Sequence, residues 1–212
     1  MLIIFDCDGV LVDSEPLAAK AFSSCLHDEG VTMSPQECMD EFRGHTLEYC
    51  FSWLANSFEL QLPESFANTL DAATTSLFED ELQATQGVVN LLEKVEQKNI
   101  SFCVASNGGH KKIEHSLEIT GLLPWFGDRR FSKEDVAQGK PSPDLFLHAA
   151  EVMGVPAKFA TVVEDSAAGI QAAKAAGMSV IHFNALPFAQ AIPEGVVEVS
   201  SMLELQKILP GF

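Results

Sequence analysis

The stretch that decides the fold is LIIFDCDGV, residues 2–10. Its apolar segment, Leu2 to Phe5, indicates a strand covered on both faces, as in a parallel sheet. Asp6 and Asp8 follow at the carboxyl end of that strand, which is the end where open α/β sheets bind ligands. Two carboxylates so close together repel each other, and a divalent cation removes that repulsion. The alternative is an ordinary acidic turn before a glycine.

Beyond this strand the sequence pattern changes twice along the chain. From about residue 16 to residue 80, apolar residues recur every three or four positions, which predicts helices. From about residue 84 onward, helical segments alternate with short apolar strands, which is typical of βαβ units around a parallel sheet. We therefore predict an α/β fold with a Rossmann-like parallel sheet core, formed by residues 1–15 and 81–212. A small α-helical domain, residues 16–80, is inserted after the first strand.

Composition and charge limit the classes of partner. The formal net charge of −17 and the pI near 4.5 argue against nucleic acid or an anionic membrane, because both bind basic surfaces. The five cysteines include no C-x-x-C pair, so neither a disulfide framework nor a zinc site is indicated. No secretory leader and no apolar stretch of membrane-spanning length is recognisable. We expect a cytoplasmic protein with a small-molecule partner.

Three later segments are expected at the same edge of the sheet. The strand ISFCVAS ends at residues 106–109, where a hydroxyl, two glycines and a helix N-terminus together can bind an anion. The strand ATVVED ends at the acidic pair Glu164 and Asp165, and Lys140 precedes another helix. Taken singly, these are a glycine turn, a helix cap and a surface lysine. Taken together at one edge, they predict magnesium-assisted phosphoryl transfer.

These segments, in order, resemble the four motifs of the haloacid dehalogenase superfamily. The matching segments are Asp6-Cys7-Asp8-Gly9-Val10, Ser106-Asn107, Lys140-Pro141 and Glu164-Asp165-Ser166. The resemblance covers essentially the whole chain, and the helical block resembles the small α-helical cap of that superfamily. The β-phosphoglucomutase-like sugar phosphatases are the branch that it resembles most. The stretch SNGGHKKIEHSLE is similar to bacterial 6-phosphogluconate phosphatases.

The resemblance implies a role for each matching residue. Asp6 would be the nucleophile that forms an aspartyl-phosphate. Asp8 would protonate the leaving alcohol and then activate water. Ser106 and the amide of Asn107 would bind the transferring phosphoryl group, and Lys140 would neutralise its charge.

The resemblance also implies a magnesium site. Mg²⁺ would be held by the Asp6 carboxylate, the backbone carbonyl of Asp8 and Asp165, with water and phosphate completing an octahedron. Glu164 would be either a further ligand or a partner of the ligands. The implied function is a Mg²⁺-dependent phosphatase acting on a small sugar phosphate or sugar-acid phosphate, with 6-phosphogluconate as one candidate.

Substrate specificity in this group resides in the helical cap. Arg43, Gly44 and His45 lie between two predicted cap helices, and Arg43 stands out as a cation in an acidic segment. Its guanidinium could bind a carboxylate or a sugar hydroxyl, the alternative being an exposed loop arginine. His110 and Lys111, at the start of the helix that follows Ser106, are weaker candidates for ligand contacts.

Two other functions remain as alternatives. β-Phosphoglucomutases resemble one another in a histidine twelve residues after the nucleophile, where this chain has Ala18, which favours transfer to water. A phospho-accepting receiver-like module has its acidic pair after the first strand, whereas Glu164 and Asp165 come late in this chain. We expect a monomer or a weak homodimer.

Overall fold

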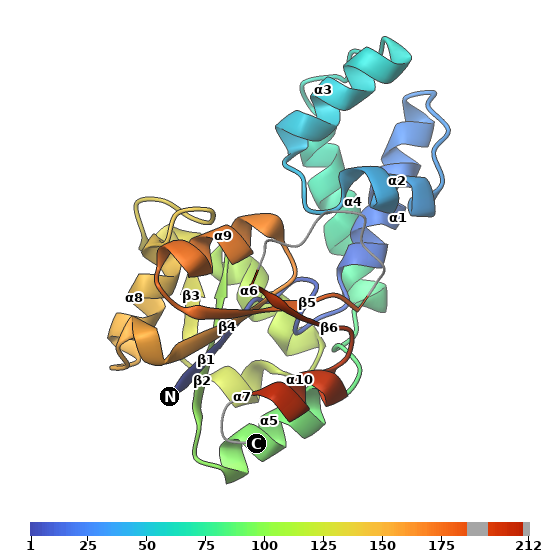
Figure 1. Ribbon diagram of the computed structural model, residues 1–212. Helices are drawn as coiled ribbons and strands as arrows, with labels where there is room; N and C mark the ends of the chain where they lie inside the picture. Colours follow the sequence, from blue (N-terminus) through green and yellow to red (C-terminus); the bar gives the residue numbers. More distant parts are fainter. Residues whose placement is uncertain (186–194, 210–212) are drawn as a thin grey trace. The chain divides into compact units, whose positions relative to one another are not determined.

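The computed structural model describes residues 1–185 and 195–209 (Figure 1). The chain forms two compact units. The sheet unit comprises Met1–Val12 and Gln83–Phe212, and the helical unit comprises Asp13–Leu82. The sequence analysis placed these boundaries at residues 15/16 and 80/81, and its C-terminal range includes residues 186–194 and 210–212, which lie outside the described part of the chain.

The described part of the sheet unit contains a six-stranded parallel sheet in the order β3-β2-β1-β4-β5-β6. The strands are β1 (Leu2–Phe5), β2 (Ser101–Ser106), β3 (Arg130–Ser132), β4 (Ala160–Glu164), β5 (Ser179–Phe183) and β6 (Val197–Val199). From β1 the chain runs outward through β2 and β3, and then returns to the other side of β1 with β4. Ligands bind at such a reversal of strand order. The sheet confirms the predicted α/β class and its Rossmann-like core.

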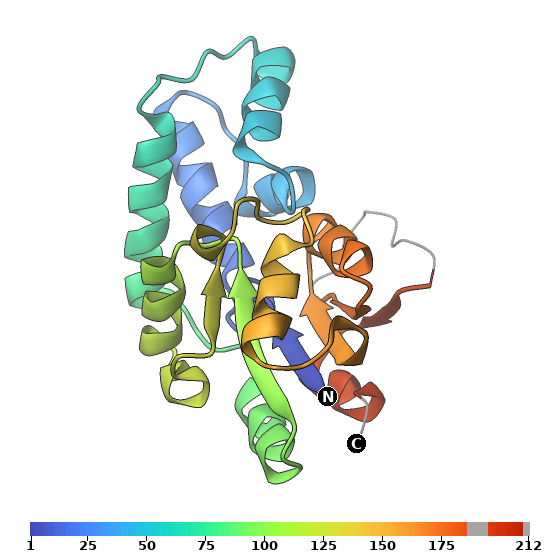
Figure 2. The same cartoon turned by 90° about the vertical axis from the view of Figure 1, so that its left-hand side faces the viewer.

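Helices cover both faces of this sheet (Figures 1 and 2). The helices of the sheet unit are α5 (Val88–Gln97), α6 (His110–Ile119), α7 (Leu123–Phe126), α8 (Asp144–Val152), α9 (Ala167–Ala175) and α10 (Met202–Ile208), with short 3₁₀ turns at η1 (Lys133–Asp135) and η2 (Ala157–Phe159). Helices α8 and α9 pack on one face, and α5 and α10 lie on the other. Because both faces are covered, every residue of β1 is fully buried. Apolar packing therefore fixes the position at which Asp6 leaves the sheet.

The helical unit consists of four helices within the described residues. They are α1 (Glu15–Asp28), α2 (Pro35–Phe42), α3 (Leu47–Phe58) and α4 (Phe66–Glu81). Helix α2 begins with a capping box, in which Ser34 and Glu37 satisfy each other's backbone amides. The aromatic ring of Phe22 packs against those of Phe42 and Phe66 in its core. This unit therefore has an apolar core of its own.

No helix in the described residues combines the length and the apolar character that crossing a membrane requires.

Candidate active site

Three charged side chains gather in a buried position at the carboxyl edge of the sheet. Asp6 follows β1, and its backbone amide donates a hydrogen bond to the carbonyl of Val163 in β4. The Lys140 Nζ atom lies 2.8 Å from Asp6 Oδ1 and 3.5 Å from Glu164 Oε2. All three side chains are buried, and Glu164 is completely inaccessible. The strand ends thus bring together residues that are far apart in the sequence.

Asp6, Glu164 and Asp165 form a carboxylate cluster, in which one oxygen atom from each residue lies within 4.8 Å of the others. Burial, followed by the negative charge of Asp6, raises the pKa of Glu164, whereas Lys140 acts in the opposite direction. Hard divalent cations prefer carboxylate oxygens and would relieve the crowding of negative charge. The residues present therefore fit a divalent metal.

Two glycines make room for this carboxylate cluster. Gly9 has φ +72°, and a side chain at this position would collide with the carboxylate of Asp165. Gly169, in the first turn of α9, faces Glu164, and a Cβ atom there would overlap the Glu164 carboxylate. Ser166 caps α9 and donates a hydrogen bond to Glu164 Oε1 at 2.5 Å. The start of α9 therefore holds the Glu164 side chain against the backbone.

Lys140 is held as a buried cation. Burial lowers its pKa, but the charges of Asp6 and Glu164 outweigh this effect, so that the pKa lies above its ordinary value. Its Nζ atom also lies 4.9 Å from the centre of the Phe146 ring, which is a cation–π distance. Lys140 is therefore a fixed positive charge beside Asp6.

The side chain of Asn107 holds the segment that carries Lys140. Asn107 Oδ1 accepts a hydrogen bond from the Lys140 amide at 2.8 Å, and its Nδ2 donates to the Lys140 carbonyl at 2.9 Å. Sequence reasoning assigned only the backbone amide of Asn107 and did not foresee this clamp. Ser106, its buried neighbour, accepts a hydrogen bond from the Gly108 amide at 3.0 Å. The end of β2 is thereby tied to the Lys140 loop.

Asp8 has a cationic partner that the sequence analysis missed. The Nζ atom of Lys112, on α6, donates to Asp8 Oδ2 at 2.7 Å. Sequence reasoning named His110 and Lys111 on this helix as weaker candidates for ligand contacts; the His110 ring pairs with Asp135 at 2.8 Å, and Lys111 is exposed. Only the rotational position of α6 distinguishes the two lysines, and the sequence alone does not fix it.

A second missed residue is His182, which is buried in β5. Its Nε2 atom lies 3.1 Å from the carbonyl oxygen of Asp165, and its Nδ1 atom lies 3.0 Å from Glu198 Oε2. Because a carbonyl oxygen only accepts, Nε2 carries the proton of that bond. His182 therefore holds the backbone of Asp165 in place. A histidine in the apolar strand SVIHF is the only signal that the sequence offered.

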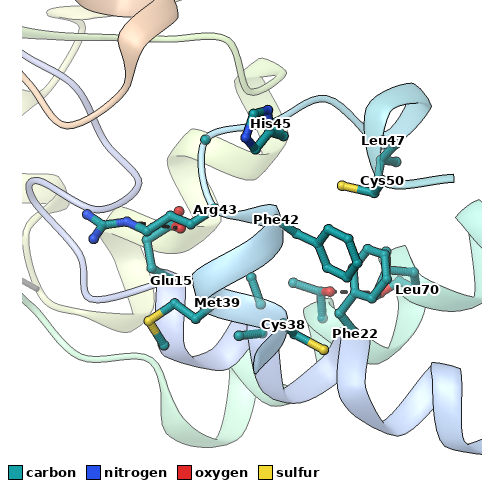
Figure 3. A pocket seen from close by; sticks show the side chains of 14 residues that line it. Glu15, Phe22, Cys38, Met39, Phe42, Arg43, His45, Leu47, Cys50 and Leu70 are labelled. Atoms are coloured by element: carbon teal, nitrogen blue, oxygen red, sulfur yellow. Dashed lines mark hydrogen bonds and ion pairs between the residues drawn. The ribbon is translucent and has the colours of Figure 1, made fainter. Parts of the chain in front are cut away.

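The remaining candidates, Arg43, Gly44 and His45, line a pocket of about 220 Å³ within the helical unit (Figure 3). Arg43 is 9% exposed, and its Nε atom lies 3.6 Å from Glu15 Oε2. Most of the other lining residues are apolar, among them Phe42. The arginine that stood out in the sequence is thus buried and already partnered by a carboxylate.

Taken together, the edge of the sheet supplies a carboxylate beside a fixed cation, a carboxylate cluster that fits a metal, and a second aspartate paired with a lysine. A carboxylate nucleophile, a point positive charge and a proton-transferring group are the components of metal-assisted phosphoryl transfer.

Comparisons with known proteins identify phosphatases and haloacid dehalogenase-like proteins as relatives of this chain. The family model described as haloacid dehalogenase-like hydrolase matches residues 3–183. The chain is 35% identical over 191 residues to 6-phosphogluconate phosphatase of Escherichia coli, covering 90% of this chain and 85% of the relative. It is 28% identical to hexitol phosphatase A of the same organism, over 86% of this chain and 82% of the relative. A conserved haloacid dehalogenase-like protein of Agrobacterium tumefaciens superposes with a TM-score of 0.87 at 32% identity, covering 98% of this chain and 96% of that one.

Proposed function

The chain belongs to the haloacid dehalogenase-like hydrolase family and is a phosphoric monoester hydrolase, and from this we propose that it hydrolyses a sugar or sugar-acid phosphate through an aspartyl-phosphate on Asp6, with Mg²⁺ as its cofactor. The observation that carries the proposal is the position of Lys140 Nζ, 2.8 Å from Asp6 Oδ1, at the edge of the carboxylate cluster. A nucleophilic carboxylate must be held in one orientation, and the negative charge of the approaching phosphate dianion must be offset. A buried cation beside the carboxylate serves both purposes.

In the first step, an oxygen of Asp6 attacks phosphorus, and the bond from phosphorus to the substrate's alcohol oxygen breaks. Asp8 gives its proton to that oxygen, so that a neutral alcohol leaves. Lys140 neutralises negative charge on the phosphoryl oxygens, and Asn107 keeps Lys140 in place. We assign Ser106 and the Asn107 amide as further contacts of the phosphoryl group.

In the second step, water attacks phosphorus, Asp8 takes a proton from that water, and the bond from phosphorus to Asp6 breaks. Phosphate leaves, and Asp6 and Asp8 regain their starting states. The carboxylate cluster and the Asp8 carbonyl would hold Mg²⁺, and its positive charge would offset the negative charge of the phosphate. His182 and Gly169 serve the site indirectly, because they set the positions of Asp165 and Glu164.

For the substrate, we propose that Arg43, Gly44 and His45 contact its organic part. The similarity to a 6-phosphogluconate phosphatase supports a sugar acid, and the similarity to a hexitol phosphatase supports a sugar alcohol. Because Glu15 already balances the charge of Arg43, the pair can bind hydroxyl groups as well as a carboxylate. The relative rates of phosphate release from sugar-acid and sugar-alcohol phosphates distinguish these two classes.

The test is phosphate release from a panel of sugar, sugar-alcohol and sugar-acid phosphates, with Mg²⁺ and with EDTA. We expect release that requires Mg²⁺ and is absent in Asp6→Asn, a nearly isosteric change. Asp128→Asn, which makes the same chemical change at an exposed position of the sheet unit, should behave as wild type. Equal release with EDTA, or from Asp6→Asn, would contradict the proposal. A mutase would instead return phosphorylated product without net release.

A further inference from the structure

Lys112 is a cation at the active site to which the mechanism above gives no role. Its Nζ atom lies 2.7 Å from Asp8 Oδ2, and its side chain is half exposed, whereas that of Asp8 is 25% exposed. The other oxygen of the same carboxylate, Asp8 Oδ1, is buried and has no hydrogen-bond partner in the described residues. The two oxygens of Asp8 are therefore in different surroundings: Oδ2 is held by Lys112, and Oδ1 is buried without a hydrogen-bond partner among the described residues.

The base of the Lys112 side chain is itself fixed. At the start of α6, the backbone amide of His110 donates to Glu134 Oε2 at 3.1 Å, and the His110 ring pairs with Asp135 at 2.8 Å. Asp135 in turn accepts a hydrogen bond from the Ser132 amide at the end of β3. These contacts hold the first turn of α6 at the edge of the sheet. The backbone that carries Lys112 is therefore fixed relative to Asp8.

From this arrangement we infer that Lys112 is a positioning residue for proton transfer by Asp8. The torsion that turns an aspartate carboxyl group is broad, so both oxygens of a free side chain exchange places readily. A charge-assisted hydrogen bond from Lys112 to Oδ2 prevents this exchange. Oδ1 is then the atom that gives the proton to the leaving alcohol and later takes one from water. The inference rests on the proposed function, because it assigns a cause to the orientation of Asp8 in that reaction.

The inference predicts a dependence on the leaving group. An alkyl phosphate needs a proton donor to expel its alcohol, whereas p-nitrophenyl phosphate releases a stable anion without one. The kcat/KM value reports the step in which the ester bond breaks. Lys112→Met should therefore lower kcat/KM for the best alkyl phosphate of the panel by at least about tenfold, because misplaced catalytic groups cost that much or more. For p-nitrophenyl phosphate the change should stay within about threefold.

The chain offers a matched control. Lys111 is the neighbouring lysine on α6, it is exposed, and no ion pair is found for it among the described residues. Lys111→Met removes the same charge and should leave both kcat/KM values close to wild type. Lys112→Arg retains a donor and should restore much of the alkyl rate, and Lys112→Gln is a second neutral variant if the methionine variant fails to fold. Thermal melting reports whether each variant is folded.

Three results would overturn the role of Lys112. The first is an equal fall in kcat/KM for both substrates in Lys112→Met, which would indicate that Lys112 attracts the phosphate. The second is the same substrate-dependent effect in Lys111→Met. The third is an unchanged kcat/KM for both substrates in Lys112→Met. Failure of the proposed function looks different, because the wild type would then release no phosphate from either ester, or Asp6→Asn would remain active.

Discussion

The ammonium group of Lys140 lies 2.8 Å from Oδ1 of Asp6, although the two residues are far apart in the sequence. Asp6 is placed by the buried strand β1, and Lys140 is placed by the side chain of Asn107 at the end of β2. The pair is thus positioned by a buried strand and by two hydrogen bonds between the Asn107 side chain and the Lys140 backbone. This arrangement makes several consequences measurable.

Replacing Lys140 should lower turnover. Lys140→Met removes the cation beside the nucleophile, and the loss of one preorganised electrostatic group costs about 10²–10³-fold in kcat. Steady-state kinetics on the best substrate measures the effect. Lys158→Met, a change at a lysine outside the site, should leave kcat unchanged. A Lys140→Met enzyme with wild-type turnover would remove Lys140 from the mechanism.

Asn107→Ala should reduce both stability and activity. Both polar groups of the Asn107 side chain bond to the backbone of Lys140, and leaving such partners unsatisfied costs about 1–3 kcal/mol. Denaturant unfolding gives the stability, and kcat gives the displacement of Lys140. We expect kcat to fall less than in Lys140→Met. Wild-type values for both quantities would show that the clamp has no role.

Magnesium should stabilise the protein through the carboxylate cluster. A ligand that binds only the folded state raises the melting temperature as its concentration rises. We expect a shift with Mg²⁺, its reversal by EDTA, and little shift in Asp165→Asn. Asp128→Asn should respond as the wild type does, because its carboxylate is exposed and outside the cluster. A full Mg²⁺ shift in Asp165→Asn would place the metal elsewhere.

Gly169→Ala tests how tightly Glu164 is held. The added methyl group would overlap the Glu164 carboxylate, so that this side chain or helix α9 must move. Overpacking of this kind typically costs about 1–3 kcal/mol of stability. We expect a lower melting temperature and a weaker response to Mg²⁺ in the same variant. If both are unchanged, the Glu164 position is less constrained than the structure indicates.

Much of this site could be predicted from the sequence because the strand ends are marked by abrupt changes from apolar to polar residues. Asp6, Asp8, Glu164 and Asp165 each follow such a run, and a parallel sheet brings those ends to one edge. The α/β class followed from the alternation of strands and helices for the same reason.

The residues that escaped prediction depend on orientation. Lys112 and Lys111 are adjacent on α6, and the rotational position of that helix decides which one reaches Asp8. His182 lies in a buried strand, and its contact with Asp165 depends on the register of β5 against β4. Arg43 stood out in the sequence as an isolated cation, but the fold of the helical unit pairs it with Glu15. Composition alone contains none of this information.

The most direct measurement is to trap the covalent intermediate. Asp8→Asn slows the attack of water, and p-nitrophenyl phosphate needs no proton donor to react, so that together they should let an aspartyl-phosphate accumulate. Borohydride reduces an acyl phosphate to the alcohol, which converts the trapped residue to homoserine, and mass spectrometry of the tryptic peptide ending at Lys20 locates it. We predict homoserine at Asp6, only when substrate is present. Modification at another residue, or an unmodified Asp6 in a protein that is releasing nitrophenol, would contradict Asp6 as the nucleophile.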